Sequence, residues 1–293
     1  MNTLDLDVMA LIFQAIEKVN SDMSALVIYN DGDQFSAGAN LNLLVQAIYQ
    51  QAWSDVESFI KQGQDAYKAL KYATFPVVGA PSGLTLGGAC EILLHCDAIQ
   101  AHAELYMGLV EVGVGLIPGW GGCKEYLYRW IQQSKRPGGP MPPIVKAFEI
   151  IGAATTSKSA MEARELLFLA ESDGITINKD RLLADAKAKA ITLCQDYLPP
   201  EPPEFQLPGA SVKAVLDLAV ENYHAQGKVS DYDVEISQRL AYVLCGGDTD
   251  ITDKLKEDEI LALERDAFIA LVRQPQTVAR LEHTLKTGKP LRN

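Results

Sequence analysis

Along the first hundred positions, segments with hydrophobic residues at helical spacing alternate with short, continuously hydrophobic runs. Apolar residues between positions 6 and 16 recur every three or four residues, as on one face of an amphipathic helix, and residues 40–71 show the same period. Between these segments lies a short continuous apolar run, which is typical of a strand buried on both faces. The predicted strands are residues 25–29, 75–79 and 97–101, with a Gly-rich turn and a short helix at 87–95 before the last. Strands that alternate with helices predict a parallel sheet with crossover helices, so the expected fold class is α/β.

Beyond Trp120 the strand pattern fades, and we expect a helical region. Two proline-rich stretches, residues 136–143 and 199–203, predict loops or linkers. We therefore expect two domains, a core at residues 1–130 that carries the candidate site and a helical C-terminal region at residues 131–293. Helices are expected at residues 157–170, 179–197, 211–226, 231–244 and 253–271.

Composition narrows the classes of protein that fit these patterns. The chain has 293 residues, of which 48% are hydrophobic and 22% charged, so it can bury a substantial core. It lacks an apolar run long enough to cross a bilayer and a basic flank at its start, so we expect a cytoplasmic protein. The net charge of −12 argues against a nucleic-acid binder, which needs a basic face. Five dispersed cysteines without a CxxC pair predict neither a disulfide framework nor a metal site.

Two glycine-bearing turns follow predicted strands, the first at residues 35–41 and the second at residues 83–91. At a turn before a helix, unpaired backbone N–H groups point outward and the helix dipole adds positive potential. Two such turns that converge can stabilise a developing oxyanion. Each turn alone is also compatible with an ordinary strand-to-helix connection, because Gly is frequent in turns.

A third segment follows at residues 107–122, with the sequence Met-Gly-Leu-Val-Glu-Val-Gly-Val-Gly-Leu-Ile-Pro-Gly-Trp-Gly-Gly. With this segment the chain resembles the crotonase superfamily of enoyl-CoA hydratases and isomerases. That family has an AGAD-like turn, a GGG-C-E-like helix start and a P-E-(x)n-G-x-x-P-G-x-G-G segment, and all three occur here in order. Glu91 and Glu111 stand 20 residues apart (111 minus 91), the register of the two catalytic glutamates in family hydratases. The resemblance implies a crotonase-like spiral of ββα units with a helical C-terminal region.

The resemblance assigns an oxyanion hole to the backbone N–H groups of Ala39 and Gly88, and catalytic roles to Glu91 and Glu111. Hydration of a trans-2-enoyl-CoA thioester builds enolate charge on its carbonyl oxygen, which two such amides would stabilise. By resemblance Glu91 activates the water and Glu111 supplies the α-carbon proton, although the two roles are coupled and could be shared. The apolar neighbours of both glutamates argue against ordinary surface carboxylates.

Further substrate contacts are implied in the same segments, because the family sets the first turn against the adenine of coenzyme A. The implied contact residues are Ala37, Gly38, Asn40, Leu41, Pro118 and Gly119. Asn40 replaces the usual Asp, which leaves backbone contacts intact and puts a side-chain role in doubt. Trp120 stands where the family often has a small residue, and it is either an acyl-chain contact or, as we favour, a core or interface aromatic.

Outside these motifs the resemblance is looser, and it has consequences for partners. The N-terminal hairpin of the family is missing, and residues 281–293 look like the end of fused β-oxidation proteins, in which a 3-hydroxyacyl-CoA dehydrogenase precedes the hydratase. We therefore expect a hydratase module with such a dehydrogenase module upstream in the native protein. The family also implies a homo-oligomer, an acyl-CoA substrate and no separate cofactor.

Three functions are compatible with the sequence. Hydration in fatty-acid β-oxidation uses both Glu91 and Glu111. A double-bond isomerase, or another enolate-forming acyl-CoA enzyme, needs only one proton-shuttling carboxylate, so the presence of both glutamates favours hydration. A non-catalytic acyl-CoA-binding or assembly module is disfavoured by the same pair.

Overall fold

The computed structural model describes residues 2–133 and 137–293, and the chain forms two compact units that are described in turn. Unit 1 comprises residues 1–40, 61–109 and 156–201, and unit 2 comprises residues 41–60, 110–155 and 202–293. The expected domain boundary at residue 130 falls inside helix α5 (Gly122–Gln132) of unit 2. It coincides with no division between the units, because residues 110–155 belong to one of them as a single stretch.

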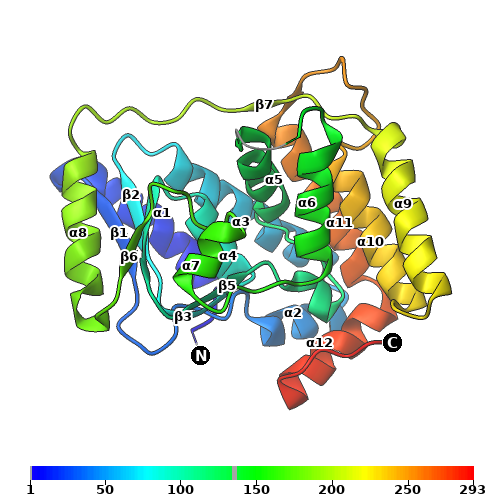
Figure 1. Cartoon of the computed structure of the whole chain (residues 1–293). Helices are drawn as coiled ribbons and strands as arrows, with labels where there is room; N and C mark the ends of the chain where they lie inside the picture. Colours follow the sequence, from blue (N-terminus) through cyan, green and yellow to red (C-terminus); the bar gives the residue numbers. More distant parts are fainter. Residues whose placement is uncertain (1, 134–136) are drawn as a thin grey trace. The chain divides into compact units, whose positions relative to one another are not determined.

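Unit 1 is built on a four-stranded sheet in the order β1-β2-β4-β6, and all of its pairings are parallel (Figure 1). Its strands are β1 (Leu26–Tyr29), β2 (Val77–Ala80), β4 (Ala98–His102) and β6 (Gly174–Thr176). The parallel sheet confirms the prediction from alternating strands and helices. β2 is buried along its whole length, but β1 is only half-buried. The expectation that β1 is buried on both faces is wrong, because β1 lies at the edge of the sheet with a neighbour on one side only.

A second sheet in unit 1 carries the glycine-rich segment. It has two parallel strands, β3 (Gly83–Leu86) and β5 (Leu105–Gly108), and Ser36 forms an isolated bridge to Thr85 of β3. The sequence predicts a turn at residues 83–86. The strand has no apolar run long enough to be recognised, since only Thr85 in it is fully buried.

The helices of unit 1 pack on its two sheets. They are α1 (Leu6–Asp22), α4 (Gly88–Leu94), α7 (Ala160–Glu165) and α8 (Leu182–Leu193), with a 3-10 turn η2 (Lys179–Arg181), while α3 (Trp53–Lys71) contributes to both units. Two of them, α1 and α7, begin at side-chain caps. The carboxylate of Asp5 accepts a hydrogen bond from the Val8 amide (3.1 Å) and so caps α1. α8 packs against β1, β2 and β4 (Figure 1). α7 is shorter than the expected helix at residues 157–170, because Leu167 adopts a left-handed backbone conformation (φ 57°).

Unit 2 is helical apart from one short antiparallel strand pair. Its elements are α2 (Leu41–Tyr49), η1 (Glu111–Val114), α5, α6 (Met141–Gly152), β7 (Glu204–Phe205), α9 (Ala210–Ala225), α10 (Asp231–Leu244), β8 (Leu255–Lys256), α11 (Glu257–Val272) and α12 (Pro275–Thr287). The helices expected at residues 211–226, 231–244 and 253–271 are confirmed as α9, α10 and α11. α5, α6 and α12 were not predicted.

The two proline-rich stretches differ in structure. Residues 199–203 form neither helix nor strand, as predicted, and a division between the two units falls within them. The expected loop at residues 136–143 is wrong at its end, because α6 begins at Met141. Pro142 and Pro143 occupy the first turn of α6, where a missing backbone N–H breaks no helical hydrogen bond. Position 136 lies outside the described residues.

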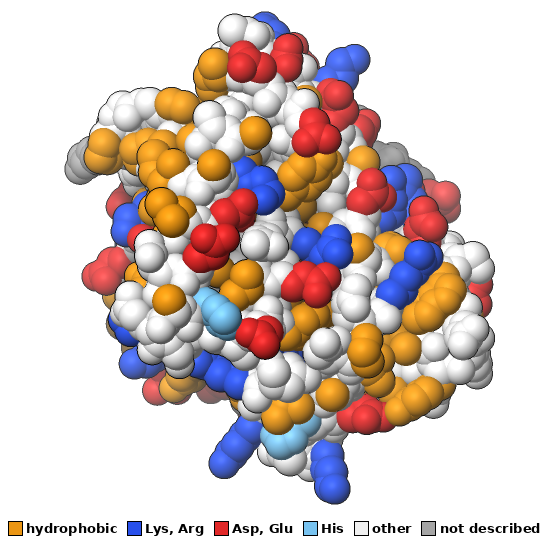
Figure 2. Space-filling view, turned by 90° about the vertical axis from the view of Figure 1, so that its right-hand side faces the viewer, with side chains coloured by type: hydrophobic (Ala, Val, Ile, Leu, Met, Phe, Trp, Pro, Cys, Tyr) orange, Lys and Arg blue, Asp and Glu red, His pale blue; other side chains and the backbone are white. Residues whose placement is uncertain are grey.

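The surface carries both signs of charge. On the face drawn in Figure 2, acidic and basic side chains are interspersed among hydrophobic ones. Several pair along a helix, such as Arg239 with Glu235 (3.0 Å). Across residues 2–133 and 137–293, no helix has the length and apolar character needed to span a bilayer. Over the same ranges, no group of three or more His, Cys, Asp or Glu side chains is arranged to hold a metal ion.

Candidate active site

The first glycine-bearing turn of unit 1 leaves the amide of Ala39 available. Gly38 N–H donates a hydrogen bond to the Ser36 hydroxyl (3.1 Å). Asn40 N–H donates to the carbonyl of Leu4 (2.9 Å). The amide between them, that of Ala39, donates to no acceptor in the described part of the chain. This turn therefore presents one main-chain donor whose neighbours are fixed by hydrogen bonds.

The second turn presents a matching donor at Gly88, the first residue of α4. The carbonyl of Gly87 accepts hydrogen bonds from the amides of Cys90 (2.7 Å) and Glu91 (3.0 Å), which closes the first turn of the helix. The Gly88 N–H has no intrahelical acceptor, as expected for the first residue of a helix. Among the residues with coordinates described here, it donates to none. The Gly88 carbonyl accepts a hydrogen bond from the hydroxyl of Tyr67 (2.9 Å), a fully buried side chain of α3.

The two turns converge within unit 1. The bridge between Ser36 and Thr85 joins the segments that lead into them, and the Leu86 amide donates to the Ser36 carbonyl (3.1 Å). A Cβ atom built on Gly38 would lie 2.7 Å from the Leu86 carbonyl oxygen and 3.2 Å from the Gly88 nitrogen. Gly38 also has φ 88°, which L side chains rarely adopt. Glycine at position 38 therefore allows the two turns, and their free amides, to approach each other.

Glu91 lies three residues after Gly88 in α4, so both are on the same side of the helix. The residue is 2% exposed. Its carbonyl oxygen is hydrogen-bonded to Nδ1 of His95 (2.7 Å), and the His95 ring lies against Tyr67 with 5.6 Å between ring centroids. Tyr67 and His95 thus hold the carbonyls at the two ends of the segment that carries the candidate amide and the candidate carboxylate.

The two residues that follow the end of α4 and His95 have local structural partners. The thiol of Cys96 contacts the Ile92 carbonyl at 3.4 Å. The carboxylate of Asp97 accepts hydrogen bonds from the Val77 amide (2.7 Å) and the Tyr197 hydroxyl (2.9 Å). Burial raises the pKa of Asp97, and these hydrogen bonds act to lower it. Asp97 thus links β2 to the segment after α8.

In unit 2, Glu111 opens the 3-10 turn η1. Its carbonyl accepts a hydrogen bond from the Leu116 amide (3.1 Å), and the turn ends at Gly115 in a left-handed conformation (φ 83°). The turn is held from α12: the Thr277 hydroxyl donates to the Gly115 carbonyl (2.7 Å). The Arg280 guanidinium donates to the carbonyl of Val112 (3.4 Å). Glu111 itself is half-buried.

The segment after η1 is packed against aromatic residues of unit 2. Pro118 and Gly119 are buried, and a Cβ on Gly119 would lie 2.9 Å from the ring of Phe268. Trp120 is 2% exposed and meets Phe59 edge to face, with 5.1 Å between ring centroids. Trp120 is therefore a core aromatic, the interpretation favoured from the sequence.

A buried charge cluster fixes the start of α5 and was not predicted. The carboxylate of Glu264 accepts hydrogen bonds from the amides of Gly121 (2.9 Å) and Lys124 (2.7 Å). The Lys124 ammonium, 1% exposed, pairs with Glu125 (2.6 Å) and also with Glu257. Burial acts to lower the pKa of Lys124, but the two carboxylates raise it above its ordinary value. The contacts made by Glu264 and Glu257 join residues more than 130 positions apart, so no local pattern indicates them.

The predicted site residues come from both units. Ala37, Gly38, Ala39, Asn40, Gly88 and Glu91 belong to unit 1, and Leu41, Glu111, Pro118 and Gly119 belong to unit 2. The structure brings the turns of Ala39 and Gly88 together within one unit. The two glutamates belong to different units, so their pairing stays a prediction.

Comparisons with known proteins add the family context. Residues 1–136 match the family model described as enoyl-CoA hydratase/isomerase. A Bacillus subtilis (strain 168) protein named probable 3-hydroxyacyl-CoA dehydrogenase is 40% identical over 293 residues, 100% of this chain and 37% of that protein. A putative fatty acid oxidation complex trifunctional enzyme of Rickettsia felis is 32% identical over 286 residues, 98% of this chain and 36% of that protein. The chain thus spans little more than a third of the length of these relatives.

Solved structures agree on the fold. The crystal structure of an enoyl-CoA hydratase from Bacillus halodurans superposes with a TM-score of 0.63 and covers 96% of this chain and 90% of that chain. The identity is 17%, so this likeness establishes the fold alone. The predicted α/β crotonase-like fold is confirmed.

Proposed function

We propose that the chain is a member of the crotonase superfamily and that it hydrates trans-2-enoyl-CoA thioesters to 3-hydroxyacyl-CoA in fatty-acid β-oxidation. The observation that carries the proposal is the convergence of two turns whose amides, at Ala39 and Gly88, donate to no acceptor within the described chain. Amides that are held in place and left unused by the fold are suited to bind an oxygen of a ligand.

The thioester carbonyl is the oxygen that this pair would bind. When water adds to the β-carbon of an enoyl thioester, electron density moves onto the carbonyl oxygen and an enolate develops. Fixed N–H donors stabilise that charge without reorganising, and loss of one such donor typically raises the barrier by about 2.7–4 kcal/mol. Convergence of the turns at Gly38 supports this role for Ala39 and Gly88.

The glutamates complete the proposed reaction. Glu91 takes a proton from water as the water oxygen bonds to the β-carbon, and Glu111 gives a proton to the α-carbon. Glu91 starts ionised and Glu111 starts protonated; one water hydrogen stays in the new hydroxyl and the other goes to Glu91. Transfer of that proton from Glu91 to Glu111 restores both carboxyl groups for the next turnover. Burial of Glu91 and half-burial of Glu111 support these roles, because general acid–base groups act best where bulk water is excluded.

Substrate binding would use the backbone around the same residues. We assign coenzyme A thioester contacts to Ala37, Gly38, Asn40, Leu41, Pro118 and Gly119. The hydration product, a 3-hydroxyacyl-CoA, is what a 3-hydroxyacyl-CoA dehydrogenase oxidises, and the Bacillus subtilis relative carries that name. We therefore propose that this hydratase module acts with a dehydrogenase module of that kind.

The test is a hydration assay on purified protein with crotonyl-CoA, followed by loss of the absorbance of the conjugated thioester. We expect steady hydration, and a loss on the order of 10²–10⁴-fold in each of Glu91→Gln and Glu111→Gln. Glu221→Gln, at an exposed position of α9, is the matched control and should keep full activity.

Other outcomes point to the alternatives. Full hydration by both Glu→Gln variants would contradict the assigned roles. Conversion of a 3-enoyl-CoA without hydration of crotonyl-CoA would identify an isomerase. Tight binding of crotonyl-CoA without any turnover would identify a non-catalytic acyl-CoA-binding module.

A further inference from the structure

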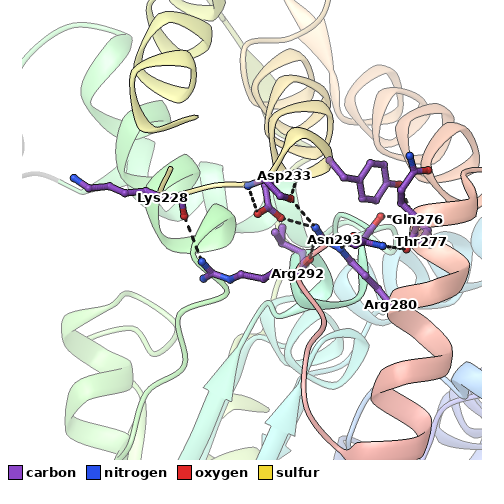
Figure 3. Close-up of polar contacts among 11 residues, drawn as sticks. Lys228, Asp233, Gln276, Thr277, Arg280, Arg292 and Asn293 are labelled. Carbon is purple, nitrogen blue, oxygen red and sulfur yellow. Dashed lines mark hydrogen bonds and ion pairs between the residues drawn. The ribbon is translucent and has the colours of Figure 1, made fainter. Parts of the chain in front are cut away.

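Two buried side chains of α12 hold the turn that carries Glu111. The Thr277 hydroxyl donates to the Gly115 carbonyl (2.7 Å), and the Arg280 guanidinium donates to the Val112 carbonyl (3.4 Å). Both side chains project from α12 in Figure 3. Thr277 is 0% exposed and Arg280 1%. The two carbonyls lie one and four residues after Glu111, so the contacts bracket η1.

Arg280 is fixed by partners on several sides. Its guanidinium pairs with the Asp233 carboxylate (2.8 Å) and donates from Nε to the side-chain oxygen of Asn293 (2.8 Å; Figure 3). It also lies over the Tyr232 ring, 5.1 Å from the ring centroid. A buried guanidinium is stable only when its donors are satisfied in good geometry. Asp233 and Asn293 orient the Arg280 guanidinium, and they thereby fix the direction of the N–H group that donates to the Val112 carbonyl.

Thr277 is fixed by Tyr232. The Tyr232 hydroxyl is hydrogen-bonded to the Thr277 hydroxyl. Thr277 has a single hydroxyl proton, which goes to the Gly115 carbonyl, so Tyr232 is the donor of the pair. Thr277 packs closely against the turn, since a Cβ atom built on Gly115 would lie 2.9 Å from Thr277 Oγ1.

We infer that Thr277 and Arg280 are positioning residues that set the direction of the Glu111 carboxylate. The inference rests on the proposed role of Glu111 in hydration. Small displacements of a reacting group have large effects, since a misplacement of about 1 Å can lower a rate on the order of 10²-fold. Loosening the two carbonyls that these side chains hold would allow such a displacement, because the Leu116 amide ties the Glu111 carbonyl to the same turn, so a shift of the turn moves Glu111 with it.

The kinetic test uses Thr277→Val, which keeps the shape of the side chain and removes both hydroxyl contacts. We expect kcat for crotonyl-CoA hydration to fall roughly tenfold or more, with KM within about twofold of wild type. In a Glu111→Gln background, Thr277→Val should cause no further loss, because the group it positions is already inactive. Thr192→Val is the matched control: its exposed hydroxyl bonds to Ala188 of the same helix (3.0 Å) and should leave kcat unchanged.

A second measurement is independent of catalysis. Hydrogen exchange read by mass spectrometry should show faster exchange in a peptide covering residues 110–117 in Thr277→Val and Arg280→Lys, with peptides of β2 and β4 unchanged. Unchanged exchange at residues 110–117, or an equal loss of kcat with and without Glu111, would refute the positioning role. If wild type does not hydrate crotonyl-CoA, the proposed function fails, and the exchange result still decides whether α12 holds the turn.

Discussion

The hydroxyl of Tyr67 donates a hydrogen bond to the carbonyl of Gly88 at 2.9 Å, and both residues are buried. Tyr67 lies in α3, and Gly88 is the first residue of α4, so this contact ties a long helix to the turn that presents the candidate amide donor. The same ring lies against His95, which bonds to the carbonyl of Glu91. One tyrosine thus supports both the candidate amide donor and the helix that carries the candidate carboxylate.

Tyr67→Phe should impair both stability and hydration. The change removes the hydroxyl that donates to the buried Gly88 carbonyl, and loss of one such hydrogen bond typically destabilises a protein by about 0.5–1.5 kcal/mol. A misaligned Gly88 amide would stabilise the developing oxyanion less well. We therefore also expect kcat to fall, by at most about 10²-fold. Urea unfolding and the crotonyl-CoA assay measure the two effects. Tyr29→Phe, which removes an exposed bond to Asp31 (3.1 Å), should change neither; an equal effect there would contradict the assignment.

Gly38→Ala should damage the candidate site more than its backbone conformation alone explains. The added Cβ would lie 2.7 Å from the Leu86 carbonyl oxygen, so the two turns must separate. Gly227→Ala is the matched control, because Gly227 also has positive φ (67°) and nothing within 4 Å of its Cβ position. A left-handed conformation destabilises an L residue by about 1–2 kcal/mol, which both variants share.

Both variants place an L residue at a positive φ, so the difference between their stabilities measures the effect of crowding around the Cβ atom added at position 38. We expect Gly38→Ala to have the lower urea midpoint and to lose hydration, while Gly227→Ala keeps full hydration. Equal midpoints and retained hydration in Gly38→Ala would show that the turns are not in close contact.

Local signals made part of the fold predictable. α10 begins at Asp231, as expected, because Ser230 and Asp233 form a reciprocal capping box ahead of an apolar repeat. β2 was predicted because it is a short continuous apolar run, and the structure shows it buried along its whole length. β6 was missed because Gly174–Thr176 is too short to show a period and is defined by its pairing with β4.

The candidate site, too, was predictable only in part from the sequence. The turns of Gly38 and Gly88 were predicted because glycine marks them in the sequence. Tyr67, Thr277 and Arg280 were not predicted. Their contacts with the candidate site join residues 21, 162 and 168 positions apart, and a single side-chain hydrogen bond over such separations leaves no periodic pattern.

Lys124→Met should be strongly destabilising at neutral pH. The change leaves the buried carboxylates of Glu125 and Glu257 without their shared cation, and breaking a buried ion pair in this way typically destabilises by about 3–5 kcal/mol. Because the pKa of Lys124 is raised above 10.5, the stabilisation is present below 10.5 and is lost as pH rises through the folded-state value. Urea midpoints measured from pH 7 upward should show this.

A second substitution tests the origin of that loss. Lys124→Met combined with Glu257→Leu removes one of the two buried carboxylates that have lost the Lys124 cation. We expect the urea midpoint of this double variant to lie between those of Lys124→Met and wild type. A double variant less stable than Lys124→Met would show that Glu257 acts through packing and not through its charge.

Acid should weaken the contact between Asp233 and Arg280. Burial acts to raise the pKa of Asp233, but hydrogen bonds from the Ser230 amide and from Arg280 hold it below its ordinary value of 3.8. A lowered carboxyl pKa stabilises the fold above 3.8, and this stabilisation is lost as pH falls through the folded-state value. Asp233→Asn should therefore lower the urea midpoint at neutral pH, and its difference from wild type should shrink below pH 3.8. Asp22→Asn, at an exposed ion pair with Lys18, should show little difference at either pH. A constant gap between Asp233→Asn and wild type across this range would contradict the charge-based account and leave hydrogen-bond geometry as the cause.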